Sequence, residues 1–164
     1  MPRVTLSDFE RLARRAHLFS DADASSTPNS HPFEQRNIYD NFPVIVRELF
    51  DDSHYAQATF EALKFLDREV ARLSAVSETG KKLMMGVFSE TNPSLQLTPL
   101  STDTDRSEQE GYKFLFAGSI LAIRNPRGHE YSVIDAIDDC LDHLSFVSML
   151  IRRLESAGFT IQRK

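Results

Sequence analysis

The segment at residues 112–123 constrains the fold of this chain more than any other feature. Its apolar side chains are Phe114, Leu115, Phe116, Ala117, Ile120, Leu121, Ala122 and Ile123. Length and the Ala and Leu content favour a helix over the alternative, a buried strand. A helix that is apolar on nearly all sides belongs in the centre of a bundle or in a subunit interface. Gly118 inside this helix costs about 1 kcal/mol relative to alanine, and close helix approach would offset that cost.

Helical spacing of apolar residues recurs along most of the remaining chain. Residues 54–75 form the clearest amphipathic helix, and shorter helical patterns cover residues 38–49 and 82–88. Pro43 lies inside the first of these shorter patterns, so a helix either begins near it or is kinked there. Residues 132–158 carry a long core stripe, which a capping box of the form Ser-x-x-Asp would start and Gly158 would end. Residues 89–106 are rich in Pro, Ser and Thr and indicate an ordered loop.

These patterns predict an all-α protein, a bundle of about four main helices with an additional N-terminal helix. The additional helix covers roughly residues 6–19, where Ser7 and Glu10 can form a capping box. We expect residues 1–31 to be this helix and a polar linker, residues 32–158 to be the helical domain, and residues 159–164 to be a tail.

Composition narrows the classes of protein that the chain can belong to. The one cysteine, Cys140, excludes an internal disulfide framework and any zinc site built on several cysteines. No apolar run reaches the roughly 20 residues that span a bilayer, and the N-terminus lacks a signal-peptide core. We therefore expect a cytoplasmic protein with no membrane contact. The net charge of −5 argues against coating nucleic acid by bulk electrostatics, although it permits one local RNA or anion site.

A dense polar cluster separates the last two apolar segments. It contains Arg124, Asn125, Arg127, His129 and Glu130. We expect the preceding helix to end near Arg124, because Pro126 disfavours α geometry at the residue before it. Five such side chains at a buried junction would be costly unless they were exposed or paired.

Two interpretations of this cluster are open. In the catalytic one, Arg124 binds a phosphate through its forked donors and His129 transfers a proton near neutral pH. Asn125 then holds the substrate or fixes the imidazole. In the structural one, Arg124 complements the helix dipole, Asn125 and Pro126 stop the helix, and His129 is a turn residue. Spacing alone favours the structural interpretation, because an arginine and a histidine five positions apart recur by chance.

Neighbouring residues are weaker candidates. Arg127 and Lys113 are either RNA-backbone contacts or ordinary surface residues, and Glu130 either orients the histidine or forms an ion pair. Gly128 would leave the turn flexible or allow a positive φ. Cys140 and His143 have metal-ligand spacing, but two residues do not make a zinc site. The sequence therefore predicts neither a metal nor a cofactor.

The segment L-A-I-R-N-P-R-G-H-E, preceded by S-E-Q-E-G, resembles the Ymh family of small prokaryotic proteins. The segment H-Y-A-Q-A-T-F-E-A-L-K resembles the central helix of that family, and the similarity covers roughly residues 32–154. The family is grouped with the HEPN superfamily of helical domains, so the resemblance implies a HEPN-like bundle. Many HEPN members are metal-independent ribonucleases with an arginine, a polar residue, a short gap and a histidine. Arg124, Asn125 and His129 match this pattern.

The resemblance implies an endoribonuclease whose site is shared by the two chains of a homodimer. The RNA 2′-hydroxyl would attack the adjacent phosphate, with His129 as acid or base, Arg124 stabilising the phosphorane and Asn125 positioning the substrate. A toxin or an antiviral defence effector, restrained by a partner protein, is the expected setting. The alternatives are a non-catalytic HEPN-like module that binds RNA, nucleotide or a partner protein through the same cleft, and a purely structural bundle.

Overall fold

The computed structural model describes residues 31–129 and 133–162, and no strand occurs among those residues. The elements are, in order, α2 Pro32–Gln35, α3 Val44–Asp51, α4 Tyr55–Ser74, α5 Gly80–Val87, α6 Asp103–Gly118, η3 Ser119–Arg124, α7 Asn125–His129 and α8 Ile137–Ser156. The prediction of an all-α protein is confirmed for this part of the chain. The additional helix expected over residues 6–19 lies outside the described residues.

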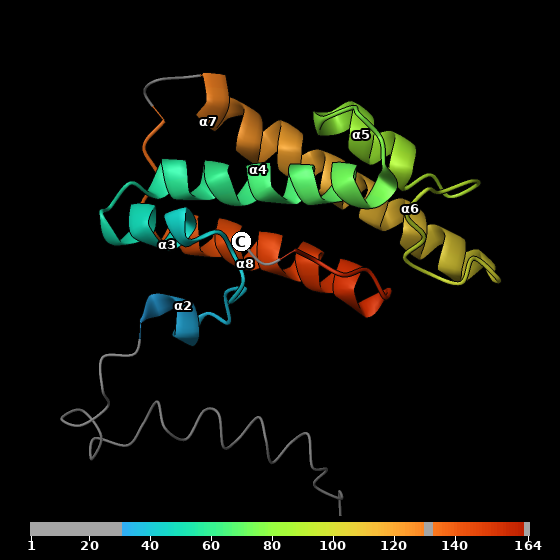
Figure 1. Cartoon of the computed structure of the whole chain (residues 1–164), viewed down its shortest axis with the longest axis horizontal. Helices are drawn as coiled ribbons and strands as arrows, with labels where there is room; N and C mark the ends of the chain where they lie inside the picture. Colours follow the sequence, from blue (N-terminus) through green and yellow to red (C-terminus); the bar gives the residue numbers. More distant parts are fainter. Residues whose placement is uncertain (1–30, 130–132, 163–164) are drawn as a thin grey trace, which may run out of the picture.

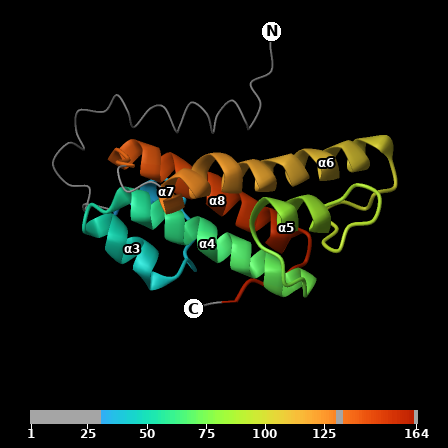
Figure 2. The ribbon, with the colours of Figure 1, turned by 90° about the horizontal axis from the view of Figure 1, so that it is seen from above.

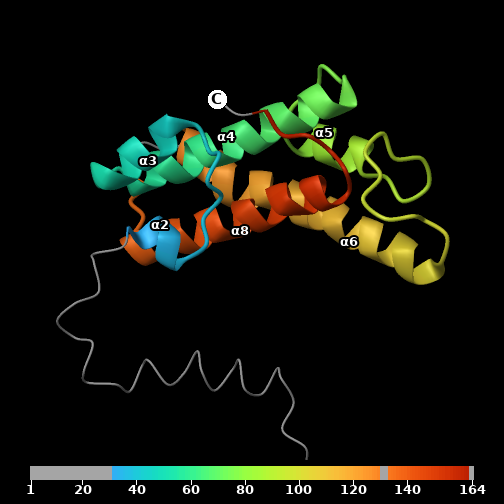
Figure 3. The same cartoon turned by 60° about the horizontal axis from the view of Figure 1, so that its bottom comes forward.

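The long helices α4 and α8 lie side by side, and α6, η3 and α7 follow one another as a single rod that packs across α4 (Figure 1). We call these three elements the rod. The short helices α3 and α5 contact α4 near its opposite ends (Figures 2 and 3). Within the described residues no helix is long and apolar enough to cross a bilayer.

One cluster of buried apolar side chains connects the longer helices. Its fully buried members include Leu63, Leu66, Leu83, Phe88, Phe116, Ile120, Leu144, Leu150 and Leu154. Phe88 and Phe116 stack with their ring centroids 4.3 Å apart, which joins the end of α5 to the rod. Each buried side chain of this size stabilises the fold by about 1.5–3 kcal/mol relative to exposure. The core therefore fixes the rod against α4. The candidate site depends on this packing, because its residues come from both.

The rod begins earlier than the apolar pattern predicts. Helix α6 starts at Asp103, because Thr102 and Asp105 form a capping box in which each side chain accepts the backbone N–H of the other. Its first turns are polar and lack the apolar residues at helical spacing from which the helix was predicted. The preceding loop is held by the buried amide of Gln109, whose Oε1 accepts the N–H of Leu97 at 2.8 Å and whose Nε2 donates to the carbonyl of Leu95 at 3.1 Å.

The rod also ends later than predicted, so the expected turn at Arg124 is wrong. The helix passes through the π-helix η3 into α7 and continues to His129. Proline lacks an N–H and clashes with the carbonyl four residues back in an α-helix. The wider π turn changes this register, and the N–H of Asn125 donates to Ile120, five residues back. Pro126 is thus accommodated inside a helix, and the polar cluster as far as His129 lies on helical backbone.

Helix α8 begins at Ile137, later than the Ser132-x-x-Asp135 pattern predicts. The N–H of Ala136 donates to the carboxylate of Asp139 at 3.3 Å, and Asp135 lies before the helix. At the other end the prediction is confirmed, because Gly158 has a φ of 90° just after the last turn.

Candidate functional site

The three residues predicted to be catalytic lie at one end of the rod. Arg124 ends η3, Asn125 begins α7 and His129 ends α7. Asn125 and His129 share a face, because they lie four positions apart in a helix. Arg124 and His129 lie five apart, which separates their directions by about 140° around the axis. A single chain therefore does not aim the arginine and the histidine at the same point.

Arg124 points toward α4. Its guanidinium carbon lies 5.7 Å from the centroid of the Phe60 ring, and its Nη2 lies 3.8 Å from Oδ2 of Asp67. The side chain is 25% exposed, while its Nε is buried with no hydrogen-bond partner. Within residues 31–129 and 133–162, no acceptor takes a hydrogen bond from this guanidinium. The positive charge has a counter-charge nearby, but its donors are not used.

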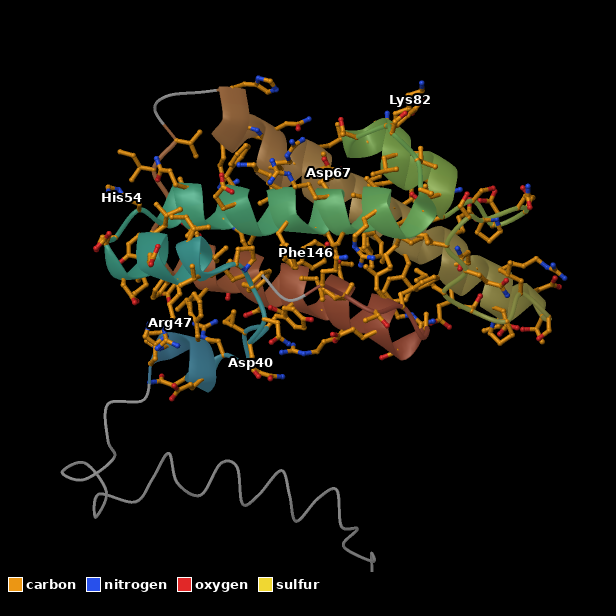
Figure 4. The ribbon with its side chains drawn as sticks, viewed as in Figure 1. Asp40, Arg47, His54, Asp67, Lys82 and Phe146 are labelled. Carbon is orange, nitrogen blue, oxygen red and sulfur yellow. The ribbon has the colours of Figure 1, made fainter. Side chains whose placement is uncertain are left out.

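Asp67 is a functional candidate that the sequence analysis missed. Its side chain is only 4% exposed, and its Oδ1 accepts the N–H of Gly80 at 2.8 Å. Figure 4 shows Asp67 on the side of α4 that faces the rod and α5. A signal for it exists in the sequence, because Asp67 lies four positions after Leu63 and three before Val70. Both of these are core residues, so a charged residue shares their buried face.

The Phe60 ring forms the contact surface between α4 and α7. A Cβ built on Gly128 would lie 2.8 Å from the nearest carbon of this ring, so only glycine fits without a shift. Gly128 lies within α7 and does not have a positive φ, so the left-handed conformation expected as one possibility there is not adopted. Its role is close approach, which places the neighbouring Arg124 over the same ring.

Arg127 has surroundings opposite to those of Arg124. Its Nε and Nη2 donate to the two carboxylate oxygens of Asp135 at 2.7 and 2.6 Å, and its Nη1 donates to the carbonyl of Ile123 at 2.7 Å. The Arg127 side chain is 9% exposed. Such a bidentate pair is among the stronger ionic contacts in proteins, and it ties α7 to the segment before α8. These three donors of Arg127 are occupied inside the fold.

His143 on α8 lies beside this pair, with its Nδ1 3.4 Å from Nη2 of Arg127. Burial lowers the pKa of His143 below its usual value, and the positive charge of Arg127 lowers it further. Asp135, Asp139 and Asp142 oppose that shift. The imidazole is therefore stabilised in its neutral form.

Lys113, the other predicted RNA contact, lies well away from Arg124. Eleven positions separate the two, which is about 16 Å along a helix. Its Nζ donates to Glu90 at 2.5 Å and lies 3.5 Å from Glu110, and the hydrogen bond to Glu90 raises the pKa of this lysine. The lysine is buried. Glu130 lies outside the described residues.

The outward face of the rod is apolar and exposed. It carries Phe114, which is 56% exposed, together with Leu115, Leu121 and Ala122, and we call these four residues with Gly118 the apolar stripe. The sequence predicted that this helix lies either in the centre of the bundle or in a subunit interface. The first prediction is wrong for this face, because its side chains are exposed. A Cβ on Gly118 would have no described atom within 4 Å, so the close approach predicted there is not made within the described part of the chain.

Cys140 shows no sign of reactivity. It is fully buried, and burial raises its pKa to about 11, so that the thiol stays protonated at neutral pH. Within the described ranges, no group of three or more His, Cys, Asp or Glu side chains could hold a metal ion.

Fold and site together define an all-helical bundle that carries a part-buried arginine and an exposed histidine on one proline-containing rod. The chain belongs to the Hypoth_Ymh family, described as a protein of unknown function, whose model matches residues 42–154. The resemblance to the Ymh family is thereby confirmed, and the match includes α4, the rod and most of α8. Comparison with curated proteins found no match, and comparison with solved structures found none.

Proposed function

We propose that this protein is a metal-independent endoribonuclease of the HEPN type, with a HEPN-like bundle and a site shared by two copies of the chain. The observation that carries the proposal is the state of Arg124. Its guanidinium lies over Phe60 and near Asp67, but no described acceptor uses its donors. An arginine in this state suits a phosphate, which it can bind through two parallel hydrogen bonds. The exposed His129 supplies a proton-transfer group at the end of the same rod.

The reaction follows from these two groups. The RNA 2′-hydroxyl loses its proton to a neutral His129 and attacks the adjacent phosphorus. The bond to the 5′-oxygen breaks, and a protonated His129 gives that oxygen its proton. The products are a 2′,3′-cyclic phosphate and a 5′-hydroxyl. Arg124 stabilises the negative charge of the phosphorane, and Asn125 holds the substrate.

A dimer would supply a second His129, so the arginine and the histidine that act on one phosphate need not come from the same chain. The apolar stripe runs along the same rod and ends at Ala122, three residues before Asn125. An exposed apolar patch of this kind is typical of an interface, and a partner helix would provide the close approach that Gly118 lacks. Two copies packed along their stripes with the rods parallel would bring the two rod ends that carry His129 close together. One histidine could then act as the base and the other as the acid.

The direct test is incubation of the purified protein with tRNA and mixed RNA in the presence of a chelator. We expect cleavage that leaves cyclic phosphate ends, and a loss of at least about 100-fold in His129→Ala. The side chain is exposed, so this substitution should change stability by no more than about 0.5 kcal/mol. Cleavage that requires added divalent metal, or equal cleavage by the variant, would contradict the proposal.

The dimer is tested separately by sedimentation of Leu121→Glu. A charge in the apolar stripe should convert the dimer to monomer and abolish cleavage. The matched control is Val44→Glu on α3, which alters an exposed apolar residue outside the stripe. This variant should leave the dimer and the RNA cleavage unchanged. A parent protein that sediments as a monomer would rule out the shared site.

The open donors of Arg124 also suit a second function, in which the same cleft binds RNA, nucleotide or a partner protein without cleaving it. RNA binding that is lost in Arg124→Lys, with no cleavage by the parent, would favour this function. A toxin or antiviral role, with a partner that restrains it, is proposed only together with cleavage.

A further inference from the structure

Asp67 is a buried carboxylate whose presence apolar packing does not explain. It occupies a core-facing position on α4 between Leu63 and Val70, both of which are fully buried. A carboxylate is costly at such a position unless its charge and its lone pairs are compensated. Its two described partners are the N–H of Gly80 and the guanidinium of Arg124.

The two oxygens of Asp67 have different roles. Oδ1 accepts the hydrogen bond from Gly80 at the start of α5, which fixes the orientation of the carboxylate. Oδ2 then lies 3.8 Å from Nη2 of Arg124, which is too far for a hydrogen bond but close for an ionic attraction. The charge of Asp67 therefore attracts the guanidinium without using its donors.

We propose that Asp67 is a positioning residue, which holds the guanidinium of Arg124 over the Phe60 ring with its Nη donors free for phosphate. The proposal rests on the ribonuclease function. Three elements contribute to this arrangement. Helix α4 carries Asp67, α5 orients it through Gly80, and the π-helix of the rod carries Arg124. A carboxylate that bound the guanidinium through two hydrogen bonds would instead occupy donors that the reaction needs.

A purely structural role would be to accept the N–H of Gly80 and so connect α4 to α5. Asp67→Asn separates the two roles, since the amide oxygen can still accept that N–H while the charge is lost. Glu69→Gln is the matched control. Glu69 is a comparably buried carboxylate on the same helix, but it pairs with Arg72 at 2.6 Å and does not contact Arg124.

The experiment measures kcat and KM for RNA cleavage by the full chain and checks the fold by circular dichroism. We expect Asp67→Asn to lower kcat about 10-fold with KM within about three-fold, because a misplaced arginine weakens the transition state more than it weakens binding. Glu69→Gln should keep kcat within about two-fold. In an Arg124→Lys background, Asp67→Asn should lower kcat no further, because the group that it positions is absent.

Each outcome decides between the proposals. If the parent protein cleaves no RNA, the ribonuclease function fails and the positioning role fails with it. If the parent cleaves and Asp67→Asn cleaves equally well, or loses no more than Glu69→Gln, only the positioning role is overturned. Should Asp67→Asn not fold, Asp67→Glu keeps the charge and moves it by one methylene. A kcat loss of about three-fold supports the proposal in that case, and an unchanged kcat overturns it.

Discussion

Two arginines three positions apart on the rod have opposite surroundings. On the side facing α8, Arg127 donates three hydrogen bonds to Asp135 and Ile123 and is almost fully buried. On the side facing α4, Arg124 lies over Phe60 with Asp67 at 3.8 Å and donates no hydrogen bond to a described residue. The first arrangement joins two parts of the bundle, and the second leaves the guanidinium without a hydrogen bond to a described residue. Identical side chains three positions apart therefore have different surroundings, because the neighbouring elements supply different partners.

The largest effect should come from breaking the locked side. Arg127→Ala should lower the free energy of unfolding by about 3–5 kcal/mol, because it leaves the buried carboxylate of Asp135 without its partner. Urea unfolding measures this change. Arg36→Ala is the control, since it removes an exposed pair with Asp138 and Asp142 and should cost no more than about 1 kcal/mol. Equal losses in the two variants would remove the distinction between the arginines.

The second largest effect should come from changing Arg124, and it should appear in RNA cleavage rather than in the free energy of unfolding. Arg124→Lys keeps a positive charge near Asp67, so we expect the free energy of unfolding to change by less than about 1 kcal/mol. RNA cleavage should fall by at least about 100-fold, because lysine lacks the forked donors that bind two phosphate oxygens. Retained cleavage would show that Arg124 supplies only charge.

A smaller effect should reveal how closely the rod approaches α4. Gly128→Ala should lower the free energy of unfolding by about 1–3 kcal/mol, because its Cβ meets the Phe60 ring at 2.8 Å. Adding Phe60→Leu should recover part of this loss. Gly86→Ala is the control, because its Cβ meets no atom within 4 Å, and it should stabilise the protein by up to about 1 kcal/mol. Additive losses in Gly128→Ala and Phe60→Leu would show that the two residues do not press on each other.

The smallest effect concerns pH. Since burial and Arg127 lower the pKa of His143 in the folded protein, the unfolded chain binds a proton more readily than the folded one. The neutral imidazole therefore contributes its full stability above about pH 6.5, and this contribution is lost as the pH falls below that value. Unfolding midpoints between pH 5 and 7 should fall less steeply with acid in His143→Gln than in the parent. Parallel curves would contradict the shift.

Local patterns predicted the elements that local interactions determine. Helix α4 was expected over residues 54–75 and spans Tyr55–Ser74, because its amphipathic spacing and flanking turns are encoded within one segment. The start of α8 was misplaced because Asp135 could cap a helix but is bound by Arg127 instead. The continuation of the rod past Pro126 was missed because proline normally ends a helix, and a π turn leaves no clear local signal.

Only the local part of the candidate site could be predicted from the sequence. Arg124, Asn125 and His129 are close in sequence, and their spacing could be compared with a family pattern. Asp67 and Phe60 lie on another helix, so their contact with Arg124 depends on how α4 packs against the rod. Arg127 and Lys113 could not be told apart from free basic residues, because their acidic partners lie elsewhere in the chain.

The sequence by itself determined that the chain is helical, which faces of its helices are apolar, and that an arginine and a histidine lie five positions apart near a proline. These properties follow from periodicity and backbone chemistry, which act over a few residues. Only the tertiary structure decided which arginine is locked and which is open, and which half of the apolar rod stays exposed. Ion pairing and burial depend on side chains brought within a few ångströms by packing, and that packing joins residues distant in the chain.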